Sequence, residues 1–353
     1  VKNFFQNPTW QKLKWPLLAL GLVLLFNFLI PTDLSRKMSD GTSYLDVIRA
    51  NNFFHLEMKN GRLFGTLVDI FNRAAPVMLL SLGMTLVIAT GGVDLSVGAV
   101  MAIAGAIAAL LLTKTHLPVS VVILISLAAS SAFGIWNGAL VGFFSVPPIV
   151  ATLILMVSGR GIAQLLTDGQ IITFKNESFE FIGRGTFLGL PFTITITVVA
   201  FLLLLLLTRK TATGLFVAAT GDNETASRYA GVNTRLVKVL VYTVCALLAG
   251  LAGLIVTSDI TAADTNNAGL WLELDAILAT VIGGTSLLGG RFYLLGSLIG
   301  AILIQTLTTT ILTRGVAVEW TLVVKAIVII AVCLLQSEQF RKTLFARRRR
   351  SAV

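Results

Sequence analysis

Long apolar runs, separated by short segments rich in charges, proline and glycine, dominate the pattern of this chain. A helix needs about 20 mostly apolar residues to cross the ~30 Å hydrocarbon layer of a bilayer, and it satisfies its backbone hydrogen bonds internally. We therefore expect an all-α, polytopic membrane protein with about ten transmembrane helices. The runs place them near residues 15–31, 75–91, 98–113, 119–144, 147–166, 191–208, 236–257, 271–289, 293–313 and 320–336.

Composition supports this prediction, since 56% of the 353 residues are hydrophobic and only 12% are charged. One soluble core could not bury so much apolar surface, so much of it must face lipid. No linker or soluble domain of useful size remains between the runs, and a single transmembrane domain is predicted for residues 1–353. The first run, Trp15 to Ile30, has no small-residue cleavage site after it, which predicts an uncleaved span.

The basic residues indicate membrane topology rather than nucleic-acid binding. The formal net charge is +10, but Lys and Arg gather at the ends of apolar runs and in a basic tail, about 337–353. Ten crossings put both termini on one face, which carries 15 Lys and Arg against 11 on the other face. The positive-inside rule then predicts that both termini are cytoplasmic.

The sequence lacks the motifs that an enzyme or a self-sufficient ATPase would need. It has no G-x-x-x-x-G-K-[ST] phosphate loop, nucleophile elbow, HExxH helix or pair of buried carboxylates. Cys245 and Cys333 lie in apolar runs, and His55 and His116 lie in loops without a ligand cluster. We expect no catalytic site, no metal and no cofactor, and an energy source outside this chain.

Small residues recur at every fourth position in three runs, which puts them on one helix face and allows close helix packing in lipid. They are Gly134, Gly138 and Gly142; Gly296 and Gly300; and Gly98, Ala102 and Ala106. Residues 85–106 also resemble residues 277–301 in the placement of their glycines. This similarity indicates an internal repeat, with chance similarity as the alternative.

The segment GGVDLSVGA, Gly91 to Ala99, interrupts two apolar runs with paired glycines and one carboxylate. Backbone that is not helical at membrane depth must be covered by protein or line a water-filled cavity. We interpret Asp94 as the cap of a helix that begins at Leu95. A position on a transport path or gate is the alternative interpretation.

Other polar side chains within the spans are mostly neutral, which suits a neutral, hydroxyl-rich solute better than an ion. Each of them could instead bond one helix to another. Lys325 lies well inside a span, yet close enough to its end for the ammonium group to reach the membrane surface. The candidate path residues are Asp94, Trp136, Asn137, Thr152, Gln164 and Gln305.

The longest loop predicted to be cytoplasmic, about 209–236, contains a hydrophilic stretch with helix signals. Either Asp222 or Asn223 can cap a two-turn helix from Glu224 to Ala230, in which an acid and a base lie four residues apart, and a glycine is placed to end it. Such a short helix is either a docking element for another subunit or a solvated connector. Its candidate residues are Gly221, Asn223, Glu224, Ala226, Arg228 and Gly231.

Three blocks give the chain a family resemblance: Asn72 to Ala106, Gly134 to Leu166 and Leu272 to Phe292. Through them the chain resembles, nearly end to end, the ten-span permeases of ribose-type ABC sugar importers. The stretches DGQIITF (Asp168 to Phe174) and TNNAGLWLELDAI (Thr265 to Ile277) are similar to the enterobacterial members that carry galactofuranose.

The resemblance implies a permease subunit that moves a galactofuranose-like or ribose-type monosaccharide across the bacterial inner membrane by alternating access. It implies cytoplasmic ATPase subunits, a periplasmic sugar-binding protein and a second permease, identical or paralogous, as partners within membrane lipid, and no nucleic acid. It also matches Gly221, Asn223, Ala226 and Gly231 to the coupling segment of the family, which favours docking over a connector.

Two other hypotheses come from different classes of protein. An ion-coupled secondary sugar transporter is the alternative function, and Asp94 would be its candidate intramembrane carboxylate. An intramembrane enzyme acting on lipid-linked sugar would need clustered acids or a metal site that the sequence does not contain.

Overall fold

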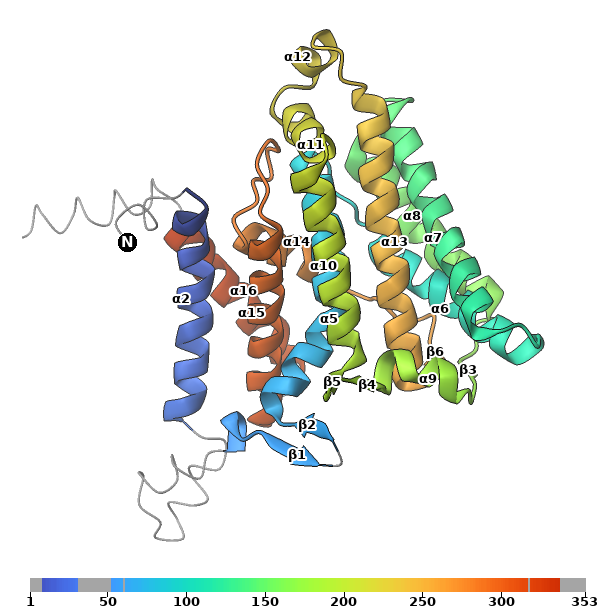
Figure 1. Cartoon of the computed structure of the whole chain (residues 1–353), viewed down its shortest axis with the longest axis vertical. Helices are drawn as coiled ribbons and strands as arrows, with labels where there is room; N and C mark the ends of the chain where they lie inside the picture. Colours follow the sequence, from blue (N-terminus) through green and yellow to red (C-terminus); the bar gives the residue numbers. More distant parts are fainter. Residues whose placement is uncertain (1–7, 31–51, 60, 317, 337–353) are drawn as a thin grey trace, which may run out of the picture.

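The computed structural model describes residues 8–30, 52–59, 61–316 and 318–336, and the predicted basic tail lies outside them. These residues are mostly helical, which confirms the all-α class (Figure 1). The elements are α2 (Pro8–Leu29), η1 (Asn52–Phe54), β1 (Glu57–Lys59), β2 (Arg62–Phe64), α5 (Thr66–Ala89), α6 (Val97–Lys114), α7 (Val119–Gly142), α8 (Pro148–Leu166), β3 (Ile172–Thr173), α9 (Glu177–Arg184), β4 (Thr186–Phe187), β5 (Leu190–Pro191), α10 (Phe192–Lys210), α11 (Thr213–Asp222), α12 (Glu224–Tyr229), α13 (Thr234–Ile260), β6 (Ala262–Ala263), α14 (Leu272–Ile282), α15 (Leu294–Thr313) and α16 (Val318–Gln336).

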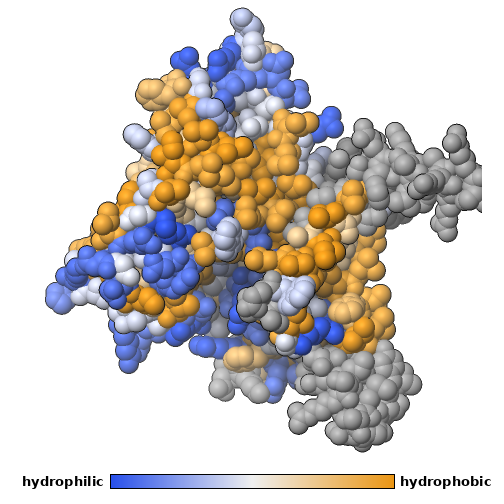
Figure 2. Space-filling view, turned by 180° about the vertical axis from the view of Figure 1, so that it is seen from behind, coloured by the Kyte–Doolittle hydropathy of each residue, from blue (hydrophilic) through white to orange (hydrophobic). Residues whose placement is uncertain are grey.

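Among the described residues, seven helices are long and apolar enough to cross a membrane: α5, α6, α7, α8, α10, α13 and α15. The predicted count of about ten is therefore not confirmed. The other predicted spans, 15–31, 271–289 and 320–336, correspond to α2, α14 and α16, which are not among the seven. Apolar surface covers the middle of the molecule, and hydrophilic residues gather at the end that carries α12 and at the opposite end (Figure 2).

The prediction of one continuous span over 271–289 is wrong, because α14 has only 11 residues. At about 1.5 Å per residue, such a helix covers roughly half of the hydrocarbon layer. It ends at Ile282 because two glycines follow. Gly284 has a φ of +92°, which residues with a side chain rarely adopt. A Cβ on Gly283 would lie 2.5 Å from the backbone nitrogen of Ser297.

Helix α13 lies at the centre of the bundle and packs against α5, α6 and α7. The predicted small-residue face of α7 makes one of these contacts. A Cβ on Gly138 would lie 2.6 Å from the Cα of Val239, and one on Gly134 would lie 2.7 Å from the Cα of Thr243. The same spacing brings Gly300 of α15 against the backbone of α14. Close helix packing through small residues is thus confirmed at both places.

Two glycine-rich interruptions, residues 90–96 and 283–293, have a similar place in the fold. Each follows one helix and precedes another, α5 and α6 in the first case and α14 and α15 in the second. The backbone nitrogen of Gly290 donates to the carbonyl oxygen of Ala89, the last residue of α5, over 3.0 Å. A Cβ on Gly289 would lie 3.0 Å from the backbone nitrogen of Gly91, so the two interruptions touch. The segments predicted to be repeats therefore share their order of elements and meet in space.

Lys325 of α16, which was expected to extend toward the membrane surface, forms an ion pair with Asp275 of α14. Its Nζ lies 2.9 Å from Oδ2 of Asp275, and both side chains are largely buried. The ammonium group is therefore held by a carboxylate of α14. The sequence did not indicate this partner, because Asp275 is 50 residues away.

The two ends of the bundle differ. Helices α11 and α12 project at one end, whereas α9 and the two-stranded sheets β1–β2 and β4–β5 lie at the other (Figure 1). In the β3–β6 pair, Ile172 lies opposite Ala263 and Thr173 opposite Ala262. This pair ties the segment after α8 to the end of α13.

Candidate functional site

Most of the predicted site residues fall into three places in the structure; Trp136 and Gln305 lie in none of them. The first is the coupling segment, defined as residues 209–236 and containing α11 and α12. The second is the polar cluster, a set of buried side chains around the interruption 90–96. The third is the recess, a cavity beside α8. Each is built from different helices, and each is described in turn.

The coupling segment forms two helices where the sequence predicted one. Helix α11 was missed, because its residues are mostly small and apolar and give no helical period. Helix α12 begins at Glu224 as predicted, and Asn223 caps it, since its side-chain oxygen accepts from the backbone nitrogen of Ala226 over 2.9 Å. The chain leaves α12 through Gly231, whose φ of +87° suits glycine.

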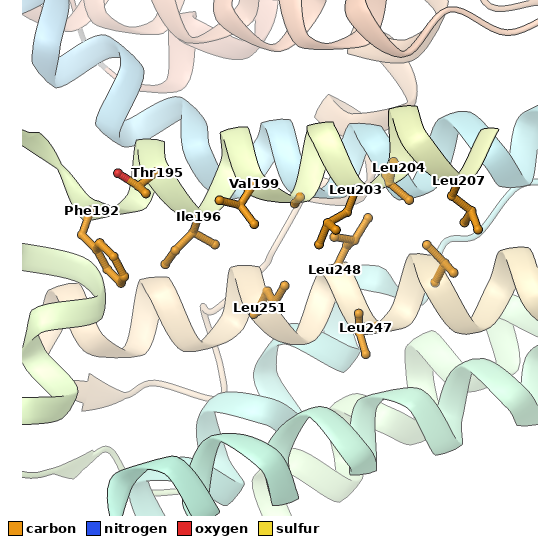
Figure 3. A pocket seen from close by; sticks show the side chains of 12 residues that line it. Phe192, Thr195, Ile196, Val199, Leu203, Leu204, Leu207, Leu247, Leu248 and Leu251 are labelled. Carbon is orange, nitrogen blue, oxygen red and sulfur yellow. The ribbon is translucent and has the colours of Figure 1, made fainter. Parts of the chain in front are cut away.

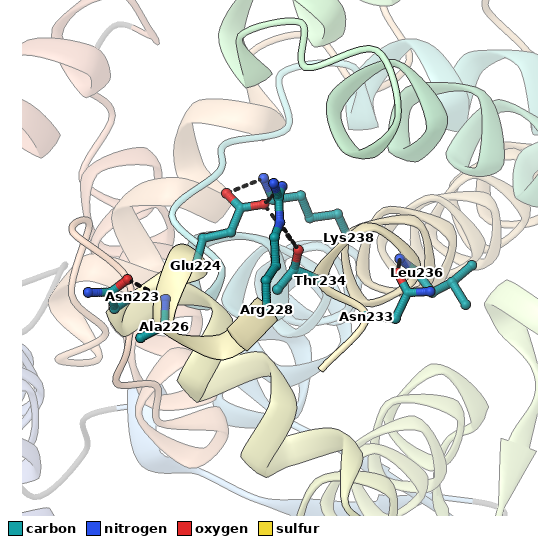
Figure 4. Close-up of polar contacts among 8 residues, drawn as sticks. All are labelled: Asn223, Glu224, Ala226, Arg228, Asn233, Thr234, Leu236 and Lys238. Atoms are coloured by element: carbon teal, nitrogen blue, oxygen red, sulfur yellow. Dashed lines mark hydrogen bonds and ion pairs between the residues drawn. The ribbon is translucent and has the colours of Figure 1, made fainter. Parts of the chain in front are cut away.

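An ion network fastens α12 to the start of α13 (Figure 4). The Glu224 carboxylate accepts from Arg228 over 2.5 Å, as the predicted spacing of four residues requires, and from Lys238 of α13 over 2.8 Å. The hydroxyl of Thr234 connects Glu224 and Arg228, because it donates to the Glu224 carboxylate and accepts from Nε of Arg228. Lys238 and Thr234 were not predicted, since nothing in the sequence shows that α13 turns back against α12.

The network changes the acidity of Glu224. Burial alone would raise the pKa of this carboxyl group, but the hydrogen bonds and positive charges of Lys238 and Arg228 outweigh burial and lower the pKa below its usual 4.5. A carboxyl group with a lowered folded-state pKa stabilises the fold above its unfolded pKa. That stabilisation is lost as the pH falls through the folded pKa.

We therefore expect α12 to stay fixed from neutral pH down to the usual carboxyl pKa of 4.5 and to loosen below it. A spin label on Thr225→Cys, at an exposed position of α12, would report this change as increased mobility at acidic pH. In the Glu224→Gln variant the label should be mobile at every pH. If the label on Thr225→Cys, with Glu224 intact, became mobile already at neutral pH or showed no change with pH, the role of Glu224 in fixing α12 would be contradicted.

Gly221 lies where three backbones meet. A Cβ there would collide with the carbonyl oxygen of Ala89, at the end of α5, and would lie 2.6 Å from the backbone nitrogen of Gly290. Gly289 in turn lies against the backbone nitrogen of Gly91, to which an added Cβ would come within 3.0 Å. The coupling segment therefore contacts the second interruption and the end of α5, which leads into the first interruption, and the two interruptions contact each other.

The polar cluster brings together three of the predicted path residues. Asp94 is 1% exposed, and its Oδ1 accepts from the backbone nitrogen of Ser96 over 2.9 Å and from its hydroxyl over 2.6 Å. Asn137 donates to the Ser96 hydroxyl over 2.9 Å. Thr152 donates to the carbonyl of Val93 over 3.3 Å. Residues from α7 and α8 thus converge on the interruption, as candidate path residues should.

The structure corrects the predicted helix start at this place. Helix α6 begins at Val97, two residues after the predicted Leu95, and Ser96 occupies the capping position without a side-chain cap bond. Asp94 instead bonds the turn that precedes the helix. Its carboxylate is fully enclosed by protein, so it does not line an open path in this conformation.

Two polar atoms of the cluster have no hydrogen-bond partner among the described residues: the hydroxyl of Tyr242 and Oδ1 of Asn137. The backbone of Gly92 lies close to the Tyr242 hydroxyl, and a Cβ there would come within 2.5 Å of it. Tyr242 and Cys245, which faces Asp94, lie near the middle of α13. The cluster is therefore in the interior of the bundle. The sequence missed Tyr242, because it lies in an apolar run.

The remaining predicted path residues do not join the cluster. Trp136 is 59% exposed, although its neighbour Asn137 is buried, because adjacent residues point to different sides of a helix. Gln305 reaches only Thr309 of its own helix, over 3.5 Å. Gln164 bonds Asn266 over 2.8 Å. A role of these three side chains on the path stays a prediction.

Gln164 instead lines the recess, a cavity of about 350 Å³ between α8, the start of α6 and the start of α14. Arg160 donates from one nitrogen to the carbonyls of Thr265 and Ala268, over 3.0 and 2.6 Å. Glu273 is buried in its wall. The sequence did not indicate Arg160 or Glu273 as site residues, because they lie about 110 positions apart and no local pattern shows that they meet.

A second cavity, of about 670 Å³, lies between α10 and α13 (Figure 3). Thr195 is the only polar residue among those that line it. A groove with one hydroxyl among apolar side chains offers too few hydrogen-bonding groups for a hydrophilic solute. No group of three His, Cys, Asp or Glu side chains that could hold a metal occurs in the described part of the chain.

Comparison with known proteins gives a consistent result. The family model described as "Branched-chain amino acid transport system / permease component" matches residues 66–333. The galactofuranose transporter permease of Escherichia coli (strain K12) is 49% identical over 335 residues, which is 94% of this chain and 92% of that protein. A fructose import permease of Bifidobacterium longum is 41% identical, over 83% of each chain. No solved structure matches.

A ribose import permease of Bacillus subtilis is 40% identical over 77% of this chain and 85% of its own length. These relatives are permease components of importers whose ATPase is a separate subunit, and such importers also use an external binding protein. Family and apolar helices together indicate a multi-pass protein of the inner membrane. The chain therefore belongs to the permease components of binding-protein-dependent ABC transport systems and is a permease subunit of a sugar importer.

Proposed function

We propose that this permease moves a galactofuranose-like monosaccharide inward as one of two permease subunits, driven by ATPase subunits that dock on the coupling segment. The observation that supports this most directly is the contact of Gly221 with Ala89 and Gly290. It joins helix α11, which leads into α12, to the end of α5 and to the second interruption, residues 283–293. Force applied outside the bundle therefore has a direct structural connection to its interior.

We also propose that the chain crosses the membrane ten times. Helices α2 and α16 would add two crossings to the seven. The tenth would combine α14 with the non-helical residues 264–271 that lead to it, because α14 alone is too short. Both termini would then lie on the cytoplasmic side with α12. Broken spans of this kind are found in transporters where backbone lines a substrate path.

Exposed apolar side chains support docking at the α12 end. Tyr229 of α12 and Leu288 of the loop between α14 and α15 are each 90% exposed, and Leu215 of α11 is 70% exposed. They lie on projecting helices and loops outside the apolar middle of the bundle. Large apolar and aromatic residues exposed to water commonly mark protein interfaces.

We expect Tyr229→Glu to weaken binding of the ATPase subunits by at least about 30-fold, which corresponds to loss of an aromatic contact worth about 2 kcal/mol. Co-purification of the ATPase with the tagged permease, and ATP hydrolysis stimulated by the complex, would measure this. Leu188→Glu is the matched control, since Leu188 is 87% exposed in the β4–β5 turn at the opposite end. Equal effects of the two variants would contradict docking at α12.

The mechanism that fits this arrangement is alternating access. A ligand or partner shifts a conformational equilibrium only as far as it binds the two states differently. ATP-dependent closure of the ATPases would move α12, and the contact at Gly221 would pass that motion to α5 and to residues 90–96. The enclosed polar cluster fits a state in which this part of the path is closed.

Reconstitution separates this function from the ion-coupled alternative. Proteoliposomes containing the permease, its ATPase and its binding protein should take up labelled sugar only with internal ATP hydrolysis, and should ignore an imposed proton or sodium gradient. Uptake against a gradient by the permease alone would overturn the proposal. Competition among galactofuranose, fructose and ribose, the sugars named for the relatives, would then identify the substrate.

A further inference from the structure

The recess beside α8 contains charged and amide groups inside a segment that spans the membrane. Arg160, Gln164 and Glu273 line it together with apolar residues. We infer that this recess contacts the transported sugar on its way through the permease, with these three side chains bonding its hydroxyl groups. The inference rests on the proposed function and adds a binding site to it.

On this inference the open side of the recess faces water rather than lipid. Charged side chains within spanning segments face the bundle interior or a water-filled cavity, because exposure to hydrocarbon is costly. Arg160 is not free to extend to the membrane surface, because its guanidinium donates to the carbonyls of Thr265 and Ala268. The polar wall is therefore fixed at an opening that must belong to an aqueous path.

The charges of the recess suit a neutral solute. The guanidinium of Arg160 interacts electrostatically with the carboxylate of Glu273, the other charged group that lines the recess, so one positive and one negative charge offset each other. What remains is a set of hydrogen-bond donors and acceptors without a strong net charge. A polyhydroxylated ring uses both kinds of group. The volume of about 350 Å³ also lies within the usual range of small-ligand sites, roughly 300–1,000 Å³.

The backbone next to the recess is held in an unusual conformation. Trp271 follows the wall residue Leu270 and has a φ of +66°, in the left-handed region that bulky residues rarely adopt. It is also 55% exposed. Strained backbone of this kind persists where the surrounding structure imposes it, often at ligand sites. An exposed indole beside the recess offers an apolar surface for the face of a sugar ring.

The recess and the coupling contact lie at opposite ends of one interruption. A Cβ on Gly98, in the first turn of α6, would lie 2.7 Å from Oε2 of Glu273, so the start of α6 forms part of the recess wall. Ala89, which touches Gly221, immediately precedes residues 90–96 at the other end. Motion of the coupling segment can therefore change the recess.

The test uses the complete importer in proteoliposomes with labelled D-galactose, D-fructose and D-ribose. We expect Gln164→Leu and Glu273→Gln each to lower uptake of the preferred sugar about tenfold and to change the preference among the three sugars, as loss of a hydrogen bond to a polar or charged partner should. ATP hydrolysis stimulated by the binding protein should stay within about twofold, because the coupling segment is intact. Gln170→Leu, which removes the same amide from the exposed turn after α8, outside the recess, is the matched control and should change neither.

Wild-type uptake and unchanged sugar preference in Gln164→Leu would overturn the inference. Gln164 is partly exposed, so this variant decides the matter even if Glu273→Gln fails to assemble. An equal effect of Gln170→Leu would also overturn it, since the effect would then not be specific to the recess. Absence of ATP-driven uptake by the unmodified complex would instead overturn the proposed function.

Discussion

Replacing Gly221 by leucine should abolish ATP-driven sugar uptake, with a loss of 100-fold or more, while the permease still inserts in the membrane. A side chain at this position would have to enter the space occupied by Ala89 and Gly290. Overpacking typically costs about 1–3 kcal/mol, and more where rigid backbone is the obstacle, so the helices must separate. Uptake and ATP hydrolysis by the reconstituted complex would show whether the two become uncoupled.

The matched control is Gly231→Ala, at the other end of α12. Gly231 also has a special conformation, with a φ of +87°, but a Cβ there would meet open space. The strain of a left-handed conformation is about 1–2 kcal/mol, so this variant should retain most of its uptake. From the sequence alone the two glycines were equivalent. In the structure Gly221 makes a close backbone contact, whereas Gly231 only forms a turn. Retained coupling in Gly221→Leu would disprove the transmission route.

Local patterns predicted the parts of the fold that depend on neighbouring residues. Apolar runs located the long helices, glycine spacing identified the face of α7 that packs on α13, and Asn223 was a correct cap for α12. Each of these features depends on residues close in the chain. The predicted end of the span that contains α14 was wrong, because Gly283 packs against α15, and a contact between two helices is not visible in a local pattern.

The candidate site was predicted less completely, because its function depends on residues that are distant in sequence. Asp94, Asn137 and Thr152 were selected for their polarity and do meet at residues 90–96. Arg160 and Glu273 come together only when α8 and α14 are placed in space. A hydrophobic pattern reports which face of a helix is polar, but not which other helix that face meets.

Asp94 should contribute more to stability than any exposed carboxylate of the chain. We expect Asp94→Ala to destabilise the purified permease by about 2–4 kcal/mol, since the buried amide and hydroxyl of Ser96 would lose their acceptor. Asp94→Asn keeps an oxygen at that position and should be affected less. Thermal unfolding in detergent would measure both. Asp69→Ala is the control, because Asp69 is exposed in the first turn of α5 and should contribute only about 0.3–1 kcal/mol there.

The same variants distinguish a structural carboxylate from a coupling one. If Asp94 stabilises the turn before α6, the Asp94→Asn importer should still take up sugar with ATP and remain indifferent to a proton gradient. An ion-coupled transporter would lose gradient-driven uptake when its carboxylate is neutralised. The contact between Ser96 and Asn137 would persist in Asp94→Asn, so the interruption should keep its shape. Full stability of Asp94→Ala would contradict this role, because a buried donor pair cannot lose its acceptor without destabilisation.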